Sequence, residues 1–217
     1  MQYYNSNIQL DKDVIKDIFN QFKPNTKMLV FGLGYDSKMW YEGNNKNTFF
    51  IENNDEYIKL NINHIPSENI IKYDYEITCS SSFNLTDNKI KEFRIPEKIL
   101  NEAPFDIIII DGPEGFSLTK PGRLIPCYWS TLLSKPGSII YIDDAKRKLE
   151  NFCIQKYFKH HYKEEFDKRQ KCVKIYIHVK PPTLSTKQTK YTTIRQSRPL
   201  LQKFNHRLHR FLLNFVN

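Results

Sequence analysis

Aspartates follow two of the most apolar stretches of the chain. Asp111 comes directly after residues 105–110, and Asp143 and Asp144 come directly after residues 138–142. If the two stretches are neighbouring parallel strands, about 4.8 Å apart, their ends meet at the edge where α/β sheets bind ligands. Carboxylates that converge there can deprotonate a hydroxyl group, or two or three of them can hold a divalent cation that lowers the pKa of the hydroxyl. For one of Asp143 and Asp144, capping of the next helix explains the residue equally well.

A glycine turn follows another apolar stretch, residues 28–31. Gly32-Leu33-Gly34 would let the backbone turn sharply and let a ligand lie against it, with helix N-terminal amides facing an anionic group. Glu52 ends the next apolar stretch, where such folds place an acid that binds both ribose hydroxyls. Together these residues indicate an adenosine-containing cofactor. Ser37 stands where a dinucleotide site needs glycine, so S-adenosylmethionine is favoured over NAD, and a tight turn with a solvated Glu52 is the alternative.

A loop rich in glycine and proline connects Asp111 to Arg123 and holds three of the seven glycines of the chain. A long loop that leaves the ligand edge of a central strand is where a substrate lid belongs. Phe116, Tyr128 and Trp129 could stack on a sugar ring, although core packing is the more frequent role of such aromatics. Arg123 could pair with a carboxylate or hold the loop in place.

Alternating strands and helices must position these residues. Apolar runs predict strands at 28–31, 48–51, 69–73, 105–110, 138–142 and 173–179, and helical spacing predicts helices at 11–22, 35–40, 54–63, 123–133 and 149–158. The run at 105–110 is apolar on both faces, as in the centre of a parallel sheet. The pattern predicts an α/β fold with a mostly parallel central sheet flanked by helices.

Composition excludes several classes of protein. Apolar residues make up 40% and charged residues 26% of the 217 residues, which is typical of a globular domain and not of a disordered or fibrous chain. No apolar run approaches the about 20 residues that a transmembrane span needs, and the first ten residues do not resemble a signal peptide. The four cysteines lack metal-ligand spacing. A cytoplasmic-type location is therefore the expectation.

The net charge of +9 is concentrated at the C-terminal end. Residues 181–217 contain seven lysines and arginines and no acid, so residues 1–180 are nearly neutral. We expect a catalytic domain at 1–180, followed by a basic arm and an amphipathic helix at 181–217. The tail could contact an anionic membrane surface as a peripheral anchor, a glycan, its own domain, or a second subunit in a homo-oligomer.

Five blocks of the sequence, in order, resemble the glucuronoxylan 4-O-methyltransferase family of plant cell-wall biosynthesis. They are 29–40 (LVFGLGYDSKMW), 50–52 (FIE), 110–116 (IDGPEGF), 121–123 (PGR) and 143–147 (DDAKR). The resemblance implies a Rossmann-like class I methyltransferase fold, S-adenosylmethionine as methyl donor, and a sugar hydroxyl in a polysaccharide or glycan as acceptor. It also implies that the cofactor residues are Gly32, Gly34, Asp36, Ser37, Glu52 and Asp111, and that Asp111 and Asp144 face the reaction centre. A similar arrangement in catechol O-methyltransferases favours a metal ion at Asp111, Asp143 and Asp144.

The sequence departs from the family pattern at three positions near the predicted site. Tyr35 and Asp143 replace histidines, and Glu114 replaces an arginine. An acid at position 114 argues against a uronic acid as acceptor and favours a neutral or amino sugar. We therefore expect Glu114, Phe116 and Arg123 to contact the substrate.

Two other functions fit parts of the sequence. A nucleic-acid (RNA) methyltransferase would explain the basic charge, but the sequence lacks the Asn/Asp-Pro-Pro-Tyr block of amino-methylating enzymes. An inactive scaffold with the same fold, docked through its basic tail, would explain the C-terminal region, but the intact Gly32, Gly34, Glu52 and Asp111 argue against it.

Overall fold

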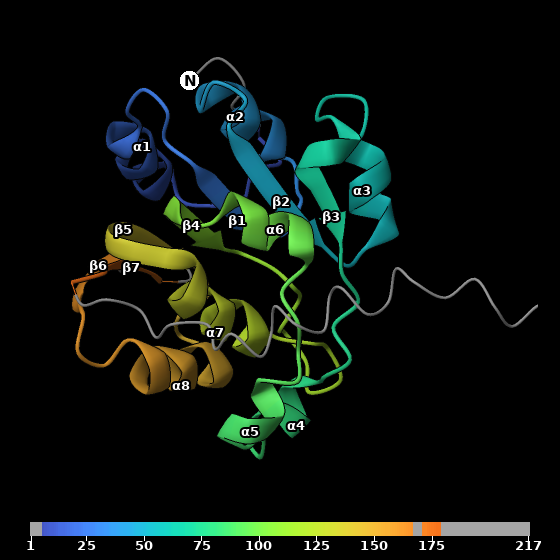
Figure 1. Ribbon diagram of the computed structural model, residues 1–217, viewed down its shortest axis with the longest axis vertical. Helices are drawn as coiled ribbons and strands as arrows, with labels where there is room; N and C mark the ends of the chain where they lie inside the picture. Colours follow the sequence, from blue (N-terminus) through green and yellow to red (C-terminus); the bar gives the residue numbers. More distant parts are fainter. Residues whose placement is uncertain (1–5, 167–170, 179–217) are drawn as a thin grey trace, which may run out of the picture. The chain divides into compact units, whose positions relative to one another are not determined.

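The computed structural model describes residues 6–166 and 171–178. Their centre is a seven-stranded sheet in the order β3-β2-β1-β4-β5-β7-β6 (Figure 1). The strands are β1 (Met28–Phe31), β2 (Thr48–Glu52), β3 (Ile70–Lys72), β4 (Phe105–Ile110), β5 (Ser134–Ile142), β6 (Tyr162–Phe166) and β7 (Cys172–Tyr176). The helices are α1 (Lys12–Gln21), α2 (Ser37–Gly43), α3 (Asp55–Asn61), α4 (Cys79–Ser82), α5 (Asp87–Ile90), α6 (Glu97–Glu102), α7 (Leu124–Leu133) and α8 (Lys148–Tyr157), with a 3₁₀ turn at Ser67–Asn69.

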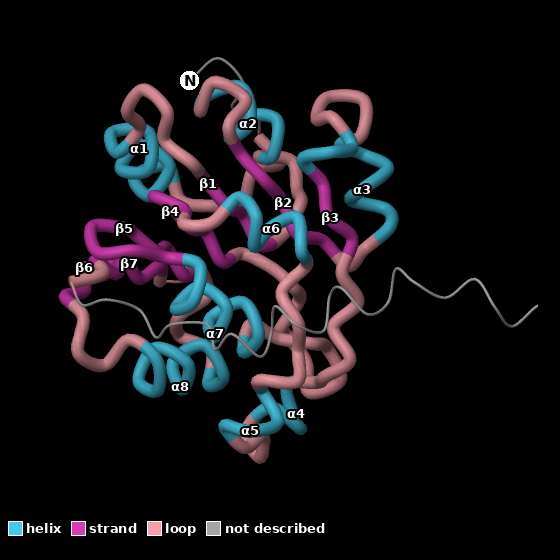
Figure 2. Tube along the Cα trace, viewed as in Figure 1, coloured by secondary structure: helices cyan, strands magenta, loops and turns pink. Residues whose placement is uncertain are grey.

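The first five strands of the sheet pair in parallel, and β7 runs antiparallel to both of its neighbours. Figure 2 shows the strands in the middle of the molecule with helices on both sides. The arrangement confirms the predicted Rossmann-like class I methyltransferase fold. Because β1, β2, β4 and β5 are parallel neighbours, their carboxyl ends share one edge, which is where ligands bind in such sheets.

Apolar side chains cover both faces of the sheet. On one face, Ile15 and Ile18 of α1 and Trp40 of α2 are fully buried in one cluster with residues of β1, β2, β4 and β5. On the other face, Trp129 of α7 packs against Phe31, with ring centroids 6.4 Å apart. In Figure 1, α1 and α2 lie on one side of the sheet and α7 and α8 on the other. The strand ends are thus fixed between two packed layers.

The sequence patterns predicted every parallel strand but not the antiparallel strand at one edge of the sheet. Strand β6 was not predicted, because its sequence, YKEEF, is mostly charged and its side chains remain partly or fully exposed. Strand β5 begins at Ser134, before the predicted start at residue 138, and its register with β4 shifts between Phe105 and Ile107. The short helices α4, α5 and α6 were also not predicted.

The basic arm and amphipathic helix predicted at 181–217 lie outside the described residues, so the expectations for that region stay predictions. Within the part of the chain that is described, no helix has both the length and the apolar character needed to cross a membrane.

Candidate active site

A cavity of about 310 Å³ lies where the predicted site residues converge. It is bounded by the carboxyl ends of the central strands, the loops that follow them, and a segment that precedes α1. Its lining residues are Asn7, Ile8, Gln9, Leu10, Val30, Gly32, Leu33, Gly34, Tyr35, Asp36, Glu52, Asn53, Asn54, Tyr57, Asp111, Gly112, Pro113, Glu114, Phe116, Arg123, Asp143, Asp144 and Arg147. Of the predicted site residues, all but Ser37 line this cavity.

Gly32 brings the ends of β1 and β4 together at the floor of the cavity. Its φ angle is +113°, and a Cβ atom at this position would lie 3.0 Å from the backbone nitrogen of Gly112. A Cβ at Gly112 would in turn lie 2.8 Å from the Cα of Gly32. Real Cβ atoms are not found at the shorter of these distances, so both residues need to be glycine for this backbone approach.

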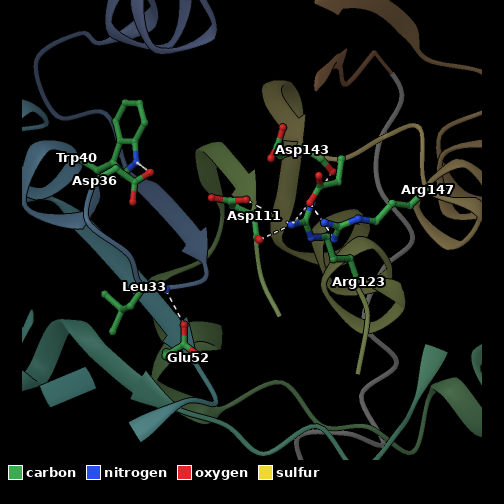
Figure 3. A network of polar contacts seen from close by, with 9 residues as sticks. Leu33, Asp36, Trp40, Glu52, Asp111, Arg123, Asp143 and Arg147 are labelled. Atoms are coloured by element: carbon green, nitrogen blue, oxygen red, sulfur yellow. Dashed lines mark hydrogen bonds and ion pairs between the residues drawn. The ribbon is translucent and has the colours of Figure 1, made fainter. Parts of the chain in front are cut away.

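Glu52 is held at the end of β2 by backbone amides. The Leu33 amide donates to Oε2 at 2.6 Å, and the amides of Asn53 and Asn54 donate to Oε1 at 2.7 and 2.6 Å. The residue is only 5% exposed, and this burial raises its pKa despite the three hydrogen bonds. The alternative of a solvated Glu52 is therefore wrong. The carboxylate is fixed at the cavity wall, next to the glycine turn (Figure 3).

Asp36 and Ser37 have different places in the turn between β1 and α2. Asp36 lines the cavity and accepts a hydrogen bond from Trp40 Nε1 at 2.8 Å (Figure 3). Burial, and then the negative charge of Asp111, raise the pKa of Asp36 to about 6. Ser37 is fully buried, and its hydroxyl accepts a hydrogen bond from the Gly34 amide, so it shapes the turn and does not reach the cavity. The expectation that Ser37 contacts the cofactor is not met by this geometry.

Arg123 joins the ends of β4 and β5. Its side chain is 3% exposed, and its Nη2 donates to the backbone oxygen of Asp111 at 2.5 Å and to Asp144 Oδ2 at 2.7 Å. Nη2 also lies 3.3 Å from Asp111 Oδ1, and Nη1 donates to the backbone oxygen of Asp143 (Figure 3). Of the two roles predicted for Arg123, these contacts match the structural one. Its guanidinium holds the carboxylates in place and is largely withdrawn from a substrate.

The three aspartates converge as predicted. One carboxylate oxygen of each lies within 4.8 Å of one from the others. Neither Asp143 nor Asp144 caps α8, since the N-cap residue is Arg147, so the capping alternative is wrong. Asp144 is buried, has a φ angle of +56°, and pairs with Arg147 Nη1 at 2.8 Å in addition to Arg123.

The contacts of the aspartates give the predicted metal site no support. A divalent cation needs several carboxylate or carbonyl oxygens that are free to coordinate it. Asp144 Oδ2 is already shared by two guanidinium groups, and Arg123 also contacts Asp111. Two positive side chains thus already contact two of the three carboxylates. No step of the reaction is therefore assigned to a metal ion.

Asp143 differs from the other two aspartates in its electrostatic surroundings. Burial, and then the charge of Asp111, raise its pKa from 3.8 to about 7, against the lowering effect of Arg123. No arginine or lysine contact within 4 Å is found for its carboxylate among the described residues, whereas Asp111 contacts one arginine and Asp144 contacts two. A carboxylate with such a pKa can accept a proton near neutral pH.

The loop between Asp111 and Arg123 borders the cavity and is fixed by backbone hydrogen bonds. The amides of Cys79 and Ser80 donate to the carbonyl oxygens of Lys120 and Leu118 at 2.7 and 3.1 Å. At the side of the cavity, Glu114 forms an ion pair with Lys120, whose Nζ also lies 5.3 Å from the Phe116 ring centroid. Phe116 is 67% exposed and lines the cavity, so it can meet a substrate.

The stacking role considered for Tyr128 and Trp129 is wrong. Trp129 is fully buried, with its ring centroid 4.9 Å from that of Tyr73, and Tyr128 packs against Tyr157 at 5.9 Å. Neither residue lines the cavity. Both aromatics lie on α7 and stabilise its packing.

Several residues that line the cavity were not predicted from the sequence, among them the segment from Asn7 to Leu10 and Arg147. The segment from Asn7 to Leu10 forms one wall. The apolar Ile8 and Leu10, just before the N-cap of α1 at Asp11, were a signal that this segment packs against the domain. For Arg147, the spacing of three residues from Asp144 was the available clue.

Comparisons with known proteins confirm the predicted resemblance. No family model matches the chain. The chain is 28% identical over 149 residues to glucuronoxylan 4-O-methyltransferase 1 of Arabidopsis thaliana, covering 57% of this chain and 51% of that protein. It is 27% identical over 161 residues to arabinogalactan O-methyltransferase 2 of the same plant, covering 62% and 55%. The chain therefore spans about half the length of the curated relatives that it matches.

A solved structure gives independent support for the fold. A TehB-like SAM-dependent methyltransferase from Corynebacterium glutamicum aligns with 80% of this chain and 90% of its own, at a TM-score of 0.51 and 11% identity. At this identity the likeness concerns the fold alone.

Proposed function

We propose that this chain is an S-adenosylmethionine-dependent O-methyltransferase whose acceptor is a hydroxyl group of a sugar in a glycan or polysaccharide. The observation that carries the proposal is the convergence of the glycine turn, Glu52 and the strand-end aspartates on one cavity. The resemblance to two groups of plant polysaccharide O-methyltransferases supports the sugar as acceptor.

The residues around the glycine turn suit the methyl donor. Glu52 is fixed by three amides at the position where such folds bind ribose hydroxyls, and Gly32 leaves the backbone open to close approach. Asp36 and Asp111 supply negative charge on the same cavity. S-Adenosylmethionine carries a positively charged sulfonium group with an electrophilic methyl group, which is the chemistry that it supplies when bound. Carboxylates near that charge favour the donor over the uncharged thioether product.

The aspartates at the ends of β4 and β5 would align and deprotonate the acceptor. Methyl transfer requires the acceptor oxygen to approach the methyl carbon in line with the breaking carbon–sulfur bond, so positioning supplies much of the rate enhancement. Asp111 is at the centre of the group in Figure 3, between Glu52 and Arg123, and its side chain is 37% exposed. We assign Asp111 to hold the acceptor hydroxyl and to receive its proton directly or through Asp143. Arg123 fixes both strand ends.

Replacement of Asp111 tests this assignment. In Asp111→Asn, the amide oxygen can still accept the contact from Arg123, so we expect calorimetry to show S-adenosylmethionine binding weakened by less than about tenfold, from the loss of one carboxylate charge, while methyl transfer falls by about a hundredfold. Asp74→Asn is a matched control, because Asp74 is exposed and does not line the cavity. Full activity in Asp111→Asn would remove this residue from the mechanism.

A further inference from the structure

The cavity has a strong excess of acidic side chains. Six carboxylic acids line it, and only two basic side chains do. The acids are Asp36, Glu52, Asp111, Glu114, Asp143 and Asp144, and the bases are Arg123 and Arg147. The methyl donor, with one carboxylate and two cationic groups, contributes a single net positive charge, so the loaded cavity keeps an excess of negative charge.

The basic side chains at the cavity already have carboxylate partners. Arg123 contacts Asp111 and Asp144, and Arg147 contacts Asp144. Lys120, which lies beside the cavity on the loop, is paired with Glu114. Proteins commonly recognise a carboxylate through a bidentate arginine contact. A carboxylate on the acceptor would have to compete with an existing acid for each of these cations.

Acidic side chains outnumber basic ones at both ends of the cavity, including the end that the acceptor would enter. Figure 3 shows Glu52 and Asp36 on one side of Asp111, and Asp143 and Arg123 on the other. The side of Glu52 suits the ribose of the donor, so the acceptor would lie near Asp111 and Asp143, with Glu114 on the adjoining loop. The raised pKa values of Asp36 and Asp143, caused first by burial and then by the charge of Asp111, are consistent with a negative potential throughout the cavity.

We infer that the acceptor is a sugar without a carboxylate group, and that a basic amino sugar is preferred to a neutral sugar and a neutral sugar to a uronic acid. This inference rests on the proposed function and specifies its substrate class. It sets the chain apart from the glucuronoxylan 4-O-methyltransferases that it resembles, whose name refers to a polysaccharide that contains glucuronic acid.

The test uses acceptors that differ only in charge. The methyl glycosides of glucosamine, glucose and glucuronic acid form one series, and the corresponding galactose compounds form a second. Each is incubated at pH 7 with the full-length chain and methyl-labelled S-adenosylmethionine, and kcat/KM is measured at low and high salt. We expect about a tenfold fall from amino sugar to neutral sugar and again to uronic acid, which is the effect of one unit charge at about 10 Å in a partly solvated cavity. High salt should reduce the differences.

A charge reversal tests whether the preference originates in the cavity. Glu114→Arg should raise the kcat/KM for the uronic acid relative to the neutral sugar by about tenfold. Glu92→Arg makes the same change at an exposed residue outside the cavity and should leave the ratio unchanged. The same glycosides are also titrated calorimetrically into the chain loaded with the thioether product S-adenosylhomocysteine, which has no methyl group to transfer, so that binding is measured without turnover.

The outcomes separate this inference from the proposed function. Transfer that is fastest to the uronic acid would overturn the inference and leave the proposed sugar O-methyltransferase in place. An unchanged ratio in Glu114→Arg would also count against it. Neither binding nor transfer in either series, despite bound S-adenosylmethionine, would reject the sugar acceptor itself and this inference with it.

Discussion

Replacement of Arg123 by methionine should destabilise the fold and disorganise the site together. Arg123 is the buried cation that connects the ends of β4 and β5 through two backbone carbonyl groups and two carboxylates. Methionine has a similar length and fills the same space, but it cannot donate a hydrogen bond. The variant therefore leaves the carbonyl oxygens of Asp111 and Asp143 without this donor and removes one of the two cations at Asp144.

The loss in the free energy of unfolding that we expect for Arg123→Met follows from the burial of its ion pair. The side chains of Arg123 and Asp144 are 3% and 7% exposed, and removing one partner of a buried ion pair costs about 3–5 kcal/mol. Asp144 keeps its contact with Arg147 at 2.8 Å, so we expect a value near the lower end, about 3 kcal/mol. Arg147→Met is the matched control. Arg147 is 31% exposed, so the loss of its ion pair with Asp144 should cost about 1 kcal/mol.

Urea denaturation of both variants and the parent chain, followed by circular dichroism, measures these free energies of unfolding. Calorimetric titration with S-adenosylmethionine and the methyl-transfer rate complete the comparison. We expect Arg123→Met to lose transfer even at temperatures where it remains folded, because the carboxylates are no longer aligned. A loss of less than 1 kcal/mol with full activity would refute the view that Arg123 organises the strand ends.

Four further predictions concern separate parts of the site. Glu52→Gln should raise the Kd for S-adenosylmethionine about tenfold, measured by calorimetry. The reason is that the side-chain NH₂ group of glutamine would face backbone amides that now donate to the carboxylate. Gly32→Ala should cost more free energy of unfolding than Gly137→Ala, since both have positive φ but only Gly32 has backbone at 3.0 Å from the added Cβ; equal losses in urea would contradict the close approach. The contribution of Asp143 to the stability of the ligand-free chain should fall as pH rises from about 4 to about 7, because its raised pKa keeps a proton on the folded state that the unfolded state has lost; the urea midpoint of Asp143→Asn relative to the parent chain should therefore rise over this range. Phe116→Ala should leave stability within about 0.5 kcal/mol, as expected for an exposed residue, and raise the acceptor KM in steady-state kinetics.

Much of the fold could be predicted because buried parallel strands have a direct sequence signature. The run at 105–110 is apolar on both faces and forms β4 with the predicted bounds. The edge of the sheet has no such signature. Strand β6 carries Lys163, Glu164 and Glu165, and its pairing with β7 comes from tertiary contact and not from local pattern.

Most residues of the candidate site could be predicted from the sequence, but the contacts among their side chains could not. Residues at the ends of neighbouring parallel strands must lie close together, so the convergence of Asp111 with Asp143 and Asp144 followed from topology. That Arg123 would turn inward and pair with Asp111 and Asp144 depends on the course of the loop before α7, which no spacing rule gives. The same limit applies to Ser37, whose hydroxyl is used within the turn.

The central claim is the transfer of a methyl group from S-adenosylmethionine to a sugar oxygen. Product analysis by NMR, with ¹³C-methyl-labelled S-adenosylmethionine and the two glycoside series, tests it most directly. We predict a labelled O-methyl signal that correlates through oxygen with a single sugar carbon, and about a hundredfold slower appearance of this signal in Asp111→Asn. A labelled methyl group on nitrogen, or no labelled product from a chain that binds the donor, would contradict the account.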